Sequence, residues 1–102
     1  MANLKVDWVL PTTRKSGKPL DPAQIDSVKI ELSADGTNFG EFGSFAPAIL
    51  SAQINELEPG TWSVRGTVKD TAGLVSAPVV QSIVIPDTTA PSELVSLSLT
   101  LV

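Results

Sequence analysis

A strict alternation of side-chain polarity over residues 62–69 constrains this chain more than any of its other features. The positions that would face a core are Trp62, Val64, Gly66 and Val68, and those between them are Ser63, Arg65, Thr67 and Lys69. A period of two residues is the pattern of a β-strand with one buried face. Turn residues bound this segment, Pro59-Gly60 before it and Asp70-Thr71-Ala72-Gly73 after it. Proline fixes φ and glycine accepts positive φ, so a strand between two turns is predicted.

Further strands are predicted on both sides of this one. Residues 4–10, 27–33 and 50–54 each predict a strand by the same alternation, and residues 79–85 predict one because they are rich in β-branched side chains. Asp35-Gly36 predicts a hairpin turn. Residues 38–45 mix glycines with phenylalanines, which is typical of a short, irregular edge strand. The only candidate helix is a single turn near residues 22–26. Short strands between turn signals predict an all-β fold, an antiparallel β-sandwich.

The composition limits the chemistry that the chain can perform. Its 102 residues suffice for one domain. The chain contains no cysteine and no histidine, so disulfides, cysteine-based metal sites and the usual serine or cysteine triads are excluded. Zinc also lacks its preferred ligands. We expect no catalytic residues, no cofactor and no metal, and hence a protein that is not an enzyme.

Nucleic acid and membranes are also disfavoured as partners. The formal net charge is −4 at pH 7, which has the wrong sign for binding phosphates. No run approaches the roughly 18 apolar residues of a membrane helix. Residues 1–10 lack the apolar segment of a signal peptide and place Asp7 where it would lie. The chain is therefore expected to leave the cell by another route or to stay inside.

Residues 4–85 together resemble a fibronectin type III domain, one of the immunoglobulin-like sandwiches. The resemblance is carried by Trp8 and Pro11, by the turn Leu57, Pro59, Gly60, Thr61 and Trp62, by the strand residues Val64, Arg65 and Val68, and by Gly73, Ser76 and Pro78 in the following loop. The chain departs from the family at Trp62, where the family usually has tyrosine. It also has almost nothing before the segment that resembles the family's second strand, so the first strand is expected to be missing.

An extra strand is predicted beyond this unit. Residues 93–102 alternate, with Val95, Leu97, Leu99 and Leu101 on one face and Ser96, Ser98 and Thr100 on the other. Burying four such apolar side chains contributes roughly 6–12 kcal/mol as an upper bound, so the segment is expected to cover a β-edge. The predicted organisation is a fibronectin type III-like sandwich over residues 1–86, a linker over 87–92 and a strand-forming arm over 93–102. The linker resembles those that join such domains in bacterial and phage proteins.

Two interpretations of the arm remain open. It either pairs within its own domain, at the edge left vacant by the missing first strand, or it pairs with an edge of a neighbouring subunit or a different partner. From Pro86 to Ser92 the chain spans at most ~23 Å, about one strand length, so pairing within the domain would be taut. Exchange is the favoured interpretation. It makes Val95, Leu97, Leu99 and Leu101 the predicted assembly residues and implies a homo-oligomer.

A basic cluster predicts a second contact. Three of the seven basic residues lie close together, at Arg14, Lys15 and Lys18. They predict a contact loop for an acidic partner or a phosphate. A solvated loop tip explains the same cluster and is the more common case.

The sequence thus predicts a non-enzymatic structural or binding module whose partner is another protein. The resemblance and the linker favour a bacteriophage virion decoration or accessory protein, with capsid or tail subunits as partners and the virion as its location. The alternative is an accessory spacer or glycan-binding domain of a secreted bacterial carbohydrate-active enzyme or adhesin, located outside the cell or on its surface.

Overall fold

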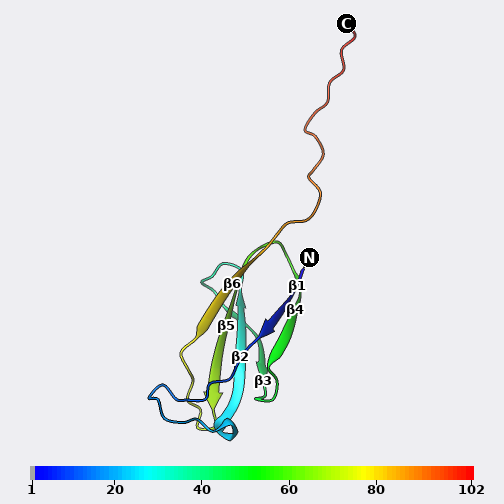
Figure 1. Ribbon diagram of the computed structural model, residues 1–102. Helices are drawn as coiled ribbons and strands as arrows, with labels where there is room; N and C mark the ends of the chain where they lie inside the picture. The colour runs from blue at the N-terminus through cyan, green and yellow to red at the C-terminus, as the bar shows by residue number, and fades with distance from the viewer. Residues whose placement is uncertain (1) are drawn as a thin grey trace.

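The computed structural model describes residues 2–102, whose regular structure is almost entirely β (Figure 1). The strands are β1 (Ala2–Asp7), β2 (Ile25–Ser33), β3 (Gly40–Phe45), β4 (Ser51–Leu57), β5 (Gly60–Asp70) and β6 (Val79–Ile85), with one 3₁₀ turn, η1 (Pro22–Gln24). The prediction of an all-β fold is confirmed. No helix among the described residues has the length and hydropathy that a bilayer span requires.

The strands form two antiparallel sheets of unequal size. The larger sheet has the order β3-β2-β5-β6, and the smaller contains β1 and β4. The long alternating segment is β5, which pairs along its length with β2 on one side and β6 on the other. Its central place explains why its sequence pattern is the clearest in the chain.

One apolar cluster joins the two sheets. Its buried members are Ile54 and Leu57 from β4 and Ile85 from β6. Trp62 and Val64 from β5 pack against this cluster, as the alternation predicted. The smaller sheet has two strands and the larger sheet has four, and the cluster includes only part of the larger sheet.

A bulge in β4 decides which of its residues are buried. The alternation of Ala52 and Ile54 predicts that residue 56 would face inward next. Instead the pairing of β1 with β4 shifts near Asn3, and Glu56 adopts a φ of 59°. The side chain of Asn3 accepts a hydrogen bond from the Glu56 N–H at 3.2 Å. The extra residue turns Leu57 into the core, where it is 5% exposed.

The other predicted segments are found, some of them with altered boundaries. The strand expected over residues 79–85 has those bounds as β6, and the irregular edge strand is β3, whose pairing with β2 carries a bulge. The strand expected over residues 4–10 ends at Asp7, and beyond it the Trp8 backbone N–H donates to Leu50 O at 3.0 Å.

Residues 86–102 lie outside both sheets. They lead away from the end of β6 as an extended arm (Figure 1), and the molecule measures 84 × 23 × 19 Å as a result. The strand predicted over residues 93–102 is not formed within the single chain, because the arm has no neighbouring strand to pair with among the described residues. The expectation that the arm fills an edge of its own domain does not describe this structure.

Candidate functional site: the arm and the groove between β1 and β6

The arm presents its apolar side chains to solvent. The four residues predicted to mediate assembly have exposed fractions of 104% for Val95, 80% for Leu97, 94% for Leu99 and 101% for Leu101. At its start, the Asp87 carboxylate accepts hydrogen bonds from the N–H and hydroxyl groups of Thr89. These bonds hold the pKa of Asp87 below its usual range. The arm therefore leaves β6 through a hydrogen-bonded turn, and beyond this turn its apolar side chains remain exposed to solvent.

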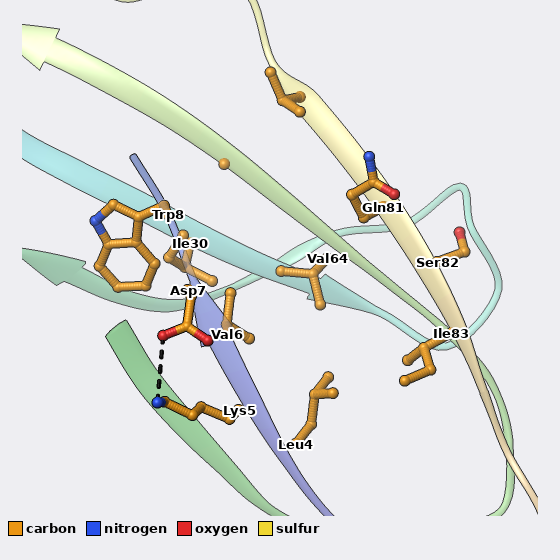
Figure 2. A pocket seen from close by; sticks show the side chains of 12 residues that line it. Leu4, Lys5, Val6, Asp7, Trp8, Ile30, Val64, Gln81, Ser82 and Ile83 are labelled. Carbon is orange, nitrogen blue, oxygen red and sulfur yellow. Dashed lines mark ion pairs between the residues drawn. The ribbon is translucent and has the colours of Figure 1, made fainter. Parts of the chain in front are cut away.

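A groove of about 390 Å³ lies between β1 and β6, and we call it the β1–β6 groove (Figure 2). Its lining residues are Leu4, Lys5, Val6, Asp7 and Trp8 from β1 and the residue after it, Ile30 from β2, Val64 and Gly66 from β5, and Val79, Gln81, Ser82 and Ile83 from β6. The lining is mostly apolar. Its charged members, Lys5 and Asp7, pair with each other at 3.5 Å and remain largely solvated.

Both strands that flank the groove have an unpaired edge. β1 pairs only with β4, and β6 pairs only with β5, among the residues that the structure describes. Each free edge carries backbone N–H and C=O groups that another strand can bond. The groove thus offers apolar contact and main-chain hydrogen bonds together, which is the chemistry of strand addition.

The inner face of β6 becomes more exposed along the groove. Ile85 lies against the core cluster and is 7% exposed, Ile83 is 43% exposed, and Val79 is 67% exposed. All three pair with residues on the inner face of β5, so the difference reflects what covers them and not the face on which they lie. β1 and β4 cover the Ile85 end of β6, and nothing in the described chain covers the Val79 end.

The direction of the two flanking strands follows from their ends. The start of β1 at Ala2 and the end of β6 at Ile85 line the same small hollow, together with Pro86 and Asp87. At the other end, Trp8 and Val79 both line the β1–β6 groove. β1 and β6 therefore run in opposite directions, and the arm departs from the end at which β1 begins (Figure 1).

The predicted contact loop, with Arg14, Lys15 and Lys18, is a hairpin. Residues 12–20 form a narrow hairpin, in which Thr13 pairs with Pro19 and the Arg14 N–H donates to Lys18 O at 2.8 Å. Gly17 has a φ of 87°, a conformation that glycine accepts without strain.

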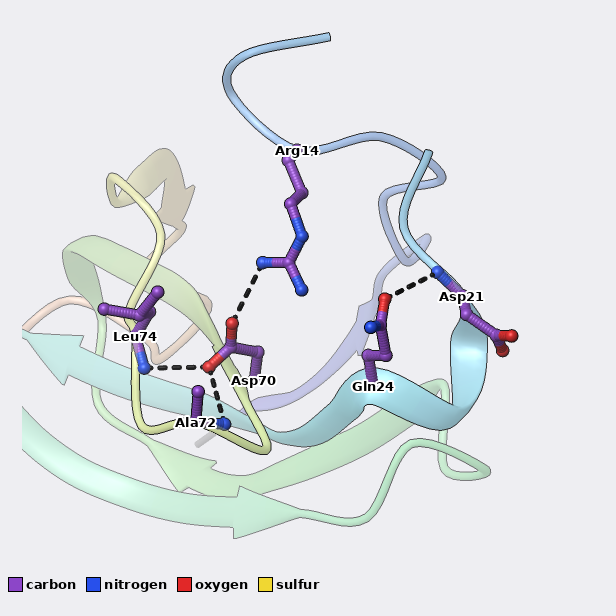
Figure 3. A network of polar contacts seen from close by, with 6 residues as sticks. All are labelled: Arg14, Asp21, Gln24, Asp70, Ala72 and Leu74. Carbon is purple, nitrogen blue, oxygen red and sulfur yellow. Dashed lines mark hydrogen bonds and ion pairs between the residues drawn. The ribbon is translucent and has the colours of Figure 1, made fainter. Parts of the chain in front are cut away.

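Arg14 is used inside the domain (Figure 3). Its guanidinium donates to the Asp70 carboxylate at 3.0 Å, and the same carboxylate accepts the N–H groups of Ala72 and Leu74. Lys15 and Lys18 are exposed and make no ion pair within residues 2–102. The structure thus assigns Arg14 a structural contact and leaves only the two lysines of the predicted cluster open to a partner.

Another ion pair lies on the face of the larger sheet that points away from the β1–β6 groove. Arg65 on β5 donates to both carboxylate oxygens of Glu31 on β2, at 3.0 and 2.9 Å. The ring of Phe39 lies 4.2 Å from the Arg65 guanidinium carbon. Hydrogen bonding to Arg65 lowers the pKa of Glu31, and the pair raises the pKa of Arg65. This is a satisfied contact between strands and offers no open binding position.

The tryptophans are engaged within the domain. Both are half-buried, and the indole N–H of Trp8 donates to Ile49 O at 3.1 Å while that of Trp62 donates to Glu58 O at 2.8 Å. Among residues 2–102, no three Asp, Glu, His or Cys side chains are grouped so as to hold a metal ion.

Sequence reasoning found the arm and missed the groove. Val79 and Ile83 share a face of β6 because they are four residues apart in a strand, but their exposure depends on what covers that face. No signal within one segment shows this, because it depends on how β1, β4 and β6 pack together.

No family model, curated protein or solved structure matches this chain.

Proposed function

We propose that this protein is a non-enzymatic structural module that assembles with another protein by adding its C-terminal arm to a β-edge. The single observation that supports this most is the solvent exposure of Val95, Leu97, Leu99 and Leu101 on one face of the arm. The unit that carries the arm is proposed to be a β-sandwich of the fibronectin type III kind. Its two antiparallel sheets and the cluster between them are consistent with that fold.

The physical reason for assembly is the cost of leaving this face in water. Burying four Val or Leu side chains contributes roughly 6–12 kcal/mol as an upper bound, comparable with the whole stability of a small domain. The alternate positions Ser96, Ser98 and Thr100 are polar. One face suits a covered position and the other suits solvent, as in a strand at the edge of a sheet.

Removal of the arm tests this function. A chain ending at Pro86 should keep its unfolding free energy, because the core cluster includes no residue beyond Ile85. It should lose the assembly that light scattering detects for the full chain. In the full chain, Leu99→Glu should also abolish assembly, whereas the matched control Thr100→Glu, on the polar face, should retain it. A full chain that stays monomeric at every concentration, with the arm freely cleaved by protease, would contradict the proposal.

A bacteriophage virion is the setting that we propose for this module. The support is the resemblance to fibronectin type III domains and the linker at residues 87–92. Lys15 and Lys18, which are exposed on the 12–20 hairpin, are proposed as secondary contacts to an acidic capsid or tail subunit. Detection of the protein by mass spectrometry in purified virions tests this setting, and its absence from the particles counts against it.

A further inference from the structure

We infer that the arm of one chain occupies the β1–β6 groove of a second copy, so that the copies join head to tail. This inference rests on the proposed function, and it adds the identity of the acceptor and the direction of the inserted strand. The fit of the two surfaces, the direction of the strands and the length of the linker support it.

The two surfaces match in chemistry and in length. The arm offers an apolar face from Val95 to Leu101, about 20 Å long at roughly 3.3 Å per residue. The groove runs along β1, a strand of six residues, and its apolar lining includes Leu4, Val64 and Ile83. An inserted strand would cover the exposed inner face at Val79 and leave its own polar side chains in solvent.

For the antiparallel pairing with β1 that we propose, the direction of β1 separates a second copy from the chain's own arm. Antiparallel pairing with β1 requires a strand that enters the groove near Trp8 and runs toward Ala2. The arm begins at the Ala2 end. To insert in that direction, the chain's own arm would first have to run back along the domain to the Trp8 end. Residues 86–92 span at most ~23 Å, which is about the length of one strand, so this path would use their whole length.

An arm from a second copy meets no such obstacle. It already points away from its own domain (Figure 1). A copy placed beyond that end, in the same orientation, receives the arm at the Trp8 end of its groove. The inserted strand then runs antiparallel to β1 and parallel to β6 of the receiving copy, and it bonds the free edge of β1.

Substitutions on the two faces of β6 test the acceptor. Val79 and Val84 are both 67% exposed, but only Val79 lines the groove. In the full chain, Val79→Glu should raise the dissociation constant for self-association by at least about tenfold, because it places a charge in the apolar contact. Val84→Glu is the matched control on the outer face and should leave the constant unchanged.

Mixing two defective chains tests the direction. Leu99→Glu keeps a normal groove and loses its donor strand, while Val79→Glu keeps its donor strand and loses the groove. Each alone should be monomeric, and the mixture should give a one-to-one heterodimer that grows no further. Amide hydrogen exchange on the unmodified protein adds a measurement that needs no variant. The β1 amides should gain protection as concentration rises.

The outcomes distinguish this inference from the function on which it rests. If Leu99→Glu abolishes assembly but Val79→Glu does not, and β1 gains no protection, the arm binds elsewhere and the inference is overturned while the proposed function stands. If the full chain is monomeric at every concentration, both are overturned. A monomer whose arm resists protease would place the arm on its own domain, and this result also overturns both.

Discussion

Asp70 fixes the turn that follows β5. Its carboxylate accepts hydrogen bonds from Arg14 and from the backbone N–H groups of Ala72 and Leu74, in a residue that is 8% exposed. Sequence reasoning identified the turn from its composition and treated Arg14 as a candidate contact residue. The pairing of the two was not predictable, since they lie 56 residues apart and the 12–20 hairpin brings them together.

Asp70→Asn should therefore lower the thermal unfolding midpoint at pH 7. Hydrogen bonds from Arg14 and the Leu74 N–H lower the pKa of Asp70 in the folded protein. A lowered folded-state pKa contributes stability that is present above the unfolded value of about 3.9 and is lost as pH falls through the folded pKa. The difference from the wild type should shrink at acid pH in thermal scans from pH 7 to pH 2.

Asp26→Asn provides the matched control. Asp26 pairs with Lys69 at 3.4 Å, but both side chains are about half exposed. Exposed pairs contribute little to stability, so this change should leave the midpoint nearly unaltered. A deficit in Asp70→Asn that persists undiminished at pH 2 would argue against the ionised carboxylate as its cause.

At the scale of elements, β4 holds the smaller sheet to the larger one. Ile54 is 3% exposed and belongs to the cluster that joins the sheets. Ile54→Ala should reduce the unfolding free energy by about 2–5 kcal/mol, because it removes buried methyl groups and leaves a cavity. Chemical denaturation measures this loss.

Ile49→Ala is the corresponding control, as the same side chain is 45% exposed just before β4 begins. Its effect should stay within roughly 1 kcal/mol. Equal losses in the two variants would mean that the sheets are not held together at Ile54.

Periodicity predicted the elements better than it predicted their ends. β5 is clear in the sequence because it keeps its alternation along its length, and β6 is clear because most of its residues are β-branched. The burial of Leu57 was not predictable, since it depends on a bulge at Glu56 that the Asn3 side chain stabilises from a distant strand. The first strand ends before Leu10 because its partner β4 starts at Ser51, opposite Asp7. Pairing, which is not local in sequence, sets each of these limits.

At the scale of the whole molecule, assembly through the arm makes the thermal stability of the protein depend on its concentration. If assembly through the arm stabilises the folded chain, the thermal unfolding midpoint of the full protein should rise with protein concentration. A chain ending at Pro86 should show a constant midpoint over the same range. Differential scanning calorimetry at several concentrations measures both, and a constant midpoint in the full protein would contradict arm-mediated assembly.

Of the candidate site, the arm could be predicted from the sequence and the groove could not, because only the arm depends on local sequence. The alternation of residues 93–102 identifies a strand that lacks a partner, since polarity along one segment is local information. The receiving surface combines residues of β1, β2, β5 and β6, which come from both sheets. The sequence of any one strand therefore does not indicate the groove.

The departure of the arm from the end at which β1 begins has a consequence for growth. Copies joined through unlike surfaces cannot form a closed pair by two-fold symmetry, so they extend as a polar filament or close as a ring. Such a filament has two different tips, one with a protruding strand and one with an empty slot. A different protein that has only a matching strand, or only a matching groove, would bind one tip and start or stop the polymer there. Such a protein would set the length of the filament.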